Sequence, residues 1–153
     1  METCDNIVAV SKINMNKYIH YTFSTYKRGQ ILVDGIADEL RTVFDEISNE
    51  KGFKIICHSI LADHVHMLVE KKPFDRNEYI MKMIKGISAN YIFSKYKINR
   101  FVFRKLWSRG YRAYELIDEI SRQRAADYIH DQKINGIDKR SQEAATFSRR
   151  LPN

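Results

Sequence analysis

Two short patterns in this 153-residue chain combine residue types and spacings that can do chemistry. The first is His64 and His66 in the segment DHVHMLVE. Side chains alternate along a β-strand, so residues two apart project from the same face. As a strand, this segment turns Val65, Met67 and Val69 toward a core and sets the two imidazoles side by side on the opposite, open face. Two neighbouring imidazoles can hold a metal ion.

The second pattern is Tyr128 and Gln132 near the C-terminus. In a helix, a spacing of four places both side chains on one ridge, with Arg124 one turn earlier. Ala125 and Ile129 supply the neighbouring apolar stripe, which predicts that the ridge lies at the edge of a helix–sheet contact. Each pattern alone also has an ordinary explanation, namely two surface histidines and a tyrosine that packs beside the core. The functional interpretation therefore depends on both patterns occurring in one fold.

The elements that position these residues follow from the hydrophobic pattern. Strands are expected at 17–25, 53–61, 64–71 and 111–116, and helices at 33–51, 77–96 and 119–133. The expected inner stripes of the first two helices are Ile36, Leu40, Val43, Phe44 and Ile47, and Ile80, Met83, Ile84, Ile87 and Tyr91. The order β-α-β-β-α-β-α predicts an α+β fold with a ferredoxin-like or RNA-recognition-like antiparallel sheet and helices on one face.

The whole chain carries a net charge of +7, and its excess of basic residues lies mostly in the last third. Residues 97–153 contain 13 of the 26 Lys and Arg residues but only 7 of the 19 Asp and Glu residues, interleaved with aromatic side chains. Cations follow a phosphate backbone and aromatic rings stack on unpaired bases, although a solvated basic surface gives the same composition. Trp107 is expected to anchor this segment in the core rather than to stack on a base. The predicted DNA contacts are Arg104, Lys105, Arg109, Arg112 and Arg124.

Length and composition predict one domain, residues 1–134, followed by a polar tail, 135–153. Cys4 and Cys57 are expected to be free thiols in a reducing compartment, and two cysteines are too few for a zinc site built from cysteine. No apolar run reaches the roughly 18 residues of a membrane span, and no signal peptide is predicted. These features predict a cytoplasmic protein.

The combination of H-x-H on a strand and Y-x-x-x-Q on the last helix resembles the single-tyrosine HUH transposases. These are the small transposases of insertion sequences, and their REP-associated relatives share the pattern. The resemblance extends from about Asn16 to Gln132 and includes the segments HYTFSTYKRGQIL and LWSRGY. It implies a transposase that cleaves and rejoins single-stranded DNA next to a hairpin through a 5′-phosphotyrosine.

The resemblance also assigns roles to single residues. It makes His64, His66 and Gln132 the metal ligands, and Tyr128 the nucleophile on a catalytic helix near the C-terminus. The implied metal is Mg²⁺ or Mn²⁺, and ligand chemistry alone favours manganese because magnesium prefers oxygen. The implied partners are single-stranded DNA with a hairpin and a second copy of the chain, with a monomer as the alternative and no membrane.

One family feature is absent from the sequence. Members of the insertion-sequence branch often carry adjacent glycines before the catalytic helix, where they let that helix move between subunits. The corresponding segment here is GYRAYELIDEI, which contains Gly110 alone. This difference argues against exchange of the helix between subunits.

Neighbouring residues give weaker predictions. His20 and His58 are expected on the open side of the sheet, either beside the site or simply at the surface. Asp63 is expected to form a turn rather than to orient a histidine. His130 lies about 100° around the helix from Tyr128 and is not expected to be a ligand.

Two alternatives to a mobile-element transposase remain open. A domesticated REP-type or replication-initiator HUH nuclease would use the same chemistry. A non-catalytic single-strand nucleic-acid-binding domain would be expected to carry aromatic residues on its central strands. The third predicted strand has histidines at those positions, which argues against the binding domain.

Overall fold

The computed structural model describes residues 15–96 and 105–132. The elements are β1 (Lys17–Ser24), a 3₁₀ turn η1 (Tyr26–Arg28), α2 (Asp34–Glu50), β2 (Lys54–Ile60), β3 (His64–Lys71), α3 (Asn77–Tyr96) and β4 (Arg112–Leu116). A last helix, called the C-terminal helix below, covers residues 119–132 of the described chain. The predicted strands and helices are therefore present with nearly the predicted bounds. Among the described residues, no helix is long and apolar enough to cross a membrane.

The four strands form one antiparallel sheet in the order β2-β3-β1-β4. The strands β3 and β1 are therefore the two central ones, and His64 and His66 lie on a central strand. The turn between β2 and β3 is tight, because the backbone N–H of Leu61 donates to the carbonyl of His64 at 2.9 Å. This arrangement confirms the predicted α+β fold with a ferredoxin-like sheet.

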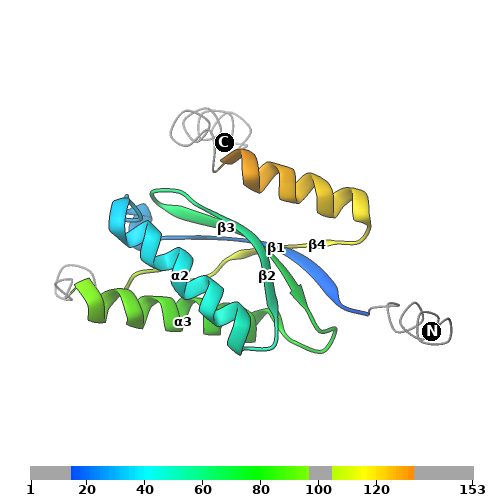
Figure 1. Cartoon of the computed structure of the whole chain (residues 1–153), viewed down its shortest axis with the longest axis horizontal. Helices are drawn as coiled ribbons and strands as arrows, with labels where there is room; N and C mark the ends of the chain where they lie inside the picture. Colours follow the sequence, from blue (N-terminus) through cyan, green and yellow to red (C-terminus); the bar gives the residue numbers. More distant parts are fainter. Residues whose placement is uncertain (1–14, 97–104, 133–153) are drawn as a thin grey trace, which may run out of the picture.

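The helices lie on both sides of the sheet (Figure 1). The helices α2 and α3 cover one face, where alternate residues of the central strands are buried: Ile19, Tyr21, Phe23, Val65, Met67 and Val69. The C-terminal helix lies across the other face, which the sequence predicted to be open. Its stripe of Ala125 and Ile129 is buried, with 8% and 1% of their surface exposed. The apolar stripe of an amphipathic helix is normally buried, and here it packs on the sheet.

The buried stripe of α2 agrees with the prediction, with Ile36 only partly buried, whereas the stripe of α3 is rotated. The residues of α3 that are buried are Ile80, Met81, Ile84, Ser88, Ile92 and Phe93, while Met83, Ile87 and Tyr91 are only partly buried. A serine at the centre of the buried stripe explains why the predicted stripe of α3 was wrong. The hydroxyl of Ser88 donates to the carbonyl of Ile84 at 2.6 Å, so a polar residue occupies a core position at little cost.

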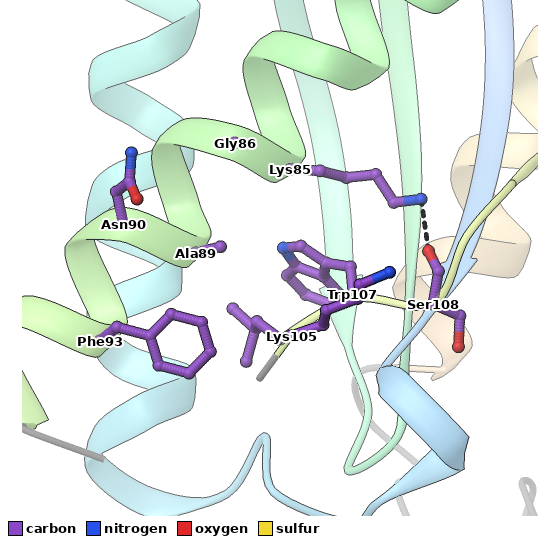
Figure 2. A pocket seen from close by; sticks show the side chains of 9 residues that line it. Lys85, Gly86, Ala89, Asn90, Phe93, Lys105, Trp107 and Ser108 are labelled. Carbon is purple, nitrogen blue, oxygen red and sulfur yellow. Dashed lines mark hydrogen bonds between the residues drawn. The ribbon is translucent and has the colours of Figure 1, made fainter. Parts of the chain in front are cut away.

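Trp107 anchors the segment between α3 and β4 in the core, as predicted. Its ring packs edge-on against Phe23 with centroids 4.8 Å apart, and its Nε1 donates to Ser88 Oγ at 2.9 Å. Figure 2 shows the indole next to α3, with Lys85 reaching from that helix to Ser108. Lys85 Nζ donates to the carbonyl oxygens of Ser108 and Gly110 at 2.8 and 2.6 Å, which fixes the start of β4.

Replacing this anchor tests the core role. Trp107→Ala should lower the free energy of unfolding by about 3–5 kcal/mol, because it removes a buried ring and leaves a cavity. Urea denaturation of the variant and the wild type measures the difference. Unchanged stability together with weaker binding of single-stranded DNA would show instead that the indole stacks on a base.

Candidate active site

His64 and His66 project from the same face of β3, as the alternation predicted. Their ring centroids are 5.1 Å apart. We call this side of the sheet the histidine face, defined by His20, Thr22, His64 and His66. The expectation that the two imidazoles are open to solvent is wrong, since each is only 7% exposed. The C-terminal helix lies over them because its apolar stripe packs on this face.

Tyr128 stands beside these imidazoles. The centroid of its ring is 5.3 Å from that of His66 and 6.1 Å from that of His20. The tyrosine also reaches solvent, since 39% of its surface is exposed. The predicted nucleophile therefore contacts a predicted metal ligand and is also accessible to a large substrate.

Gln132 is buried at the helix–sheet contact, with 1% of its surface exposed. The direction in which the C-terminal helix runs across the sheet shows where Gln132 lies. The guanidinium of Arg122 lies 4.2 Å over the ring of Tyr18 near the start of β1, and Tyr128 packs beside His20 further along that strand. Gln132 follows Tyr128 by about one turn, or about 5.4 Å. It therefore lies toward the end of the sheet where β3 carries His66 and His64.

The ring of His66 is held through its Nδ1 atom. Nδ1 is 3.1 Å from His20 Nε2 and 3.3 Å from Thr22 Oγ1, both on β1. Burial lowers the pKa of His66 to about 3, and the nearby His64 and His20 add to the effect. Burial also lowers the pKa of His20. Burial therefore favours neutral imidazoles, the form that binds metal ions.

The ring of His64 is held by a carboxylate. Asp63 Oδ1 is 2.7 Å from His64 Nδ1, and Asp63 Oδ2 is 3.6 Å from Arg28 Nε. Asp63 thus orients a histidine in addition to its place in the β2–β3 turn, which corrects the preference for the turn alone. The sequence did not indicate Thr22 or Arg28, because their proximity depends on the pairing of β1 with β3.

His58 lies on the opposite side of the sheet from the site. Its ring packs against Phe44 of α2 at 5.6 Å, and its Nε2 is 3.9 Å from Asp45 Oδ1. The prediction that it faces the histidine side is wrong. His130 is exposed on the C-terminal helix, as expected of a residue outside the site. Cys57 is a free thiol, and Cys4 lies outside the described residues.

The predicted DNA-contacting residues do not form one patch around Tyr128. Lys105, Arg109, Arg112 and Arg124 are exposed, and Arg104 lies outside the described residues. Arg112 pairs with Thr22 across β1 and β4 and so projects from the histidine face. Lys105 instead lines a pocket of about 430 Å³ beside α3, together with Phe93 and Trp107 (Figure 2). That pocket lies against α3, on the side of the sheet opposite to the histidine face.

The chemistry of the donors limits the kind of metal site that this cluster can form. In the parts of the chain that are described, no three His, Cys, Asp or Glu side chains are arranged to hold a metal ion. A site at His64 and His66 therefore needs another residue type as its third donor, and the amide oxygen of Gln132 fits that need. Two imidazoles and one amide oxygen suit a divalent cation and leave positions for substrate.

Comparison with known proteins identifies the family. Residues 13–132 match the family model of IS200-like transposases. The chain belongs to this family. The ISDra2 transposase TnpA of Deinococcus radiodurans is 28% identical over 115 residues, which cover 74% of this chain and 81% of the relative. The match to the family model confirms the predicted resemblance to single-tyrosine transposases.

Solved structures confirm the fold of this IS200-like transposase. A crystal structure described as a transposase from Deinococcus radiodurans superposes with a TM-score of 0.62 at 27% identity, over 76% of this chain and 91% of that one. A REP-associated tyrosine transposase bound to a REP hairpin superposes with a TM-score of 0.60 at 15% identity, over 80% of this chain and 68% of that one. At that identity the second similarity bears on the fold alone.

Proposed function

We propose that this transposase is a metal-dependent single-strand DNA endonuclease and strand-transferase that mobilises a DNA element next to hairpin ends. The observation that carries the proposal is the contact between Tyr128 and the buried histidine pair, with the two rings of Tyr128 and His66 centred 5.3 Å apart. A partly exposed tyrosine beside two buried imidazoles is the arrangement expected of a nucleophile next to a metal site.

The proposed metal ligands are His64, His66 and Gln132, and the proposed metal is Mg²⁺ or Mn²⁺. The carboxylate of Asp63 can only accept a hydrogen bond, so a neutral His64 ring carries its hydrogen on Nδ1 and its lone pair on Nε2. Such a carboxylate partner is typical of histidines that bind metals. A divalent cation held there would neutralise charge on the scissile phosphate and stabilise the departing 3′-oxygen.

The reaction proceeds by exchange of phosphodiester bonds. The phenol oxygen of Tyr128 attacks the phosphorus and loses its proton, while the bond from phosphorus to the 3′-oxygen breaks and that oxygen takes up a proton. The products are a 5′-phosphotyrosine and a free 3′-hydroxyl. A 3′-hydroxyl then attacks the same phosphorus, the bond to Tyr128 breaks, and the phenol is restored. Because the phosphodiester is exchanged rather than hydrolysed, rejoining requires no nucleotide cofactor.

The proposed substrate is single-stranded DNA with a hairpin. The REP-associated transposase that shares this fold was solved with a REP hairpin, and this chain carries a net charge of +7. Arg112 on the histidine face and the exposed Arg124 on the C-terminal helix are the cations best placed to follow a strand that enters at Tyr128. The homodimer expected from the sequence stays a prediction.

Removing the nucleophile tests the covalent step. Tyr128→Phe should abolish both cleavage and the covalent protein–DNA adduct, because it deletes the attacking oxygen but keeps the ring that packs on His66. Denaturing gel electrophoresis with labelled single-stranded DNA and Mn²⁺ detects the adduct, and the melting temperature checks that the fold is kept. Adduct formation at the wild-type rate would reject Tyr128 as the nucleophile.

Removing the proposed ligands tests the metal site. Cleavage should be lost in Gln132→Ala and in the double variant His64→Ala/His66→Ala, and a chelator should silence the wild type. His130→Ala is the matched control, because His130 is an exposed histidine on the same helix as Gln132. Circular dichroism checks folding, since the three ligands are buried. Cleavage by a folded double variant in Mg²⁺ would contradict the proposed site.

A further inference from the structure

We propose that His20 is a positioning residue that holds the imidazole of His66 in the tautomer whose Nε2 can bind a metal. This inference rests on the proposed metal site and names a residue outside the set of ligands. It starts from the 3.1 Å distance between His20 Nε2 and His66 Nδ1.

The sheet register fixes the contact between these two rings. Thr22 pairs with His66 and His20 pairs with Leu68, so His20 is the diagonal neighbour of His66 on the same face. The two ring centroids are 5.3 Å apart, and both residues lie on the central strands β1 and β3. Rigid backbone on both sides therefore keeps the two nitrogen atoms within hydrogen-bonding distance.

The tautomer decides which nitrogen of His66 can bind a metal. A neutral imidazole carries one N–H and one lone pair. When His66 Nδ1–H donates to His20 Nε2, the lone pair of His66 is on Nε2. When the direction is reversed, His66 Nε2 carries the hydrogen and cannot be a ligand. His20 in its acceptor form therefore gives His66 the same tautomer that Asp63 gives His64.

Thr22 shares this task. Its hydroxyl is 3.3 Å from the same Nδ1 atom and can act as a second acceptor, although a hydroxyl also donates and so selects a tautomer less strictly. His20 also packs against the ring of Tyr128, with centroids 6.1 Å apart. The ring of His20 thus contacts both a proposed ligand and the proposed nucleophile. Variants of His20 that keep either the ring or the hydrogen-bond acceptor separate its hydrogen-bonding role from its packing role.

Nitrogen-15 NMR of the metal-free, full-length protein tests the inference without relying on the metal site. Long-range ¹H–¹⁵N correlation spectra distinguish the two tautomers of each histidine. We expect His66 in the Nδ1–H form in the wild type and a mixture of tautomers in His20→Phe. The Nε2–H form in the wild type would overturn the inference, and so would an unchanged single Nδ1–H form in His20→Phe.

Affinity for Mn²⁺, measured by calorimetry, tests the consequence. His20→Phe keeps a ring but lacks an acceptor, and should bind Mn²⁺ about 10–100-fold more weakly, the usual effect of removing such a partner. His20→Gln offers an amide oxygen near the position of Nε2 and should recover most of the loss. The double variant His20→Phe/Thr22→Val should bind more weakly than either single variant. His130→Phe, an exposed position on the C-terminal helix, is the matched control and should bind like the wild type.

The outcomes separate this inference from the proposed function. Wild-type affinity in His20→Phe, or equal losses in His20→Phe and His20→Gln, would show that His20 only fills space. Wild-type affinity in His64→Ala/His66→Ala would instead reject the proposed metal site. In that case the NMR experiment still decides whether His20 sets the tautomer of His66.

Discussion

The side chains of β3 alternate between two faces, and both faces are covered. Val65, Met67 and Val69 belong to the core that α2 and α3 complete, while His66 packs against Tyr128 of the C-terminal helix, with His64 beside it. Imidazoles that a helix covers need polar partners within the protein, because burying a polar group without a hydrogen-bond partner costs about 1–3 kcal/mol in proteins. The position of the C-terminal helix on this face therefore determines which side chains can share the site with the histidines.

Two sets of contacts hold the imidazoles, and each joins distant parts of the chain. Arg28 follows β1 and contacts Asp63, which holds His64 at the start of β3. His20 and Thr22 of β1 hold His66. The central pair of strands thus orients both rings within the protein alone, and such preorganisation is what the proposed catalytic site would require. Tyr128, which packs against His66 and His20, stays partly exposed.

Local periodicity accounts for what the sequence could predict. The H-x-H spacing places two side chains on one strand face, and the spacing of four places Tyr128 and Gln132 on one helical ridge. Coverage of the histidine face could not be predicted, since it depends on where a distant helix packs. The position of His58 was missed because the pairing of β2 is irregular between Ile55 and Cys57, which reverses the alternation beyond that point. The buried stripe of α3 was predicted wrongly because Ser88, a polar residue, lies within it. Its hydroxyl is satisfied by the carbonyl of Ile84 and by the distant Trp107, and the sequence does not indicate the second contact.

The central claim is that one chain builds the whole site, because its C-terminal helix lies on the histidines of its own sheet. The most direct measurement mixes two inactive variants, Tyr128→Phe and His64→Ala/His66→Ala, and follows cleavage of labelled single-stranded DNA. Mixing either variant with the wild type controls for interference between chains. A site within one chain predicts that the two variants together stay inactive. Recovery of cleavage in the mixture would show that Tyr128 of one chain works with the histidines of another, and would contradict the account.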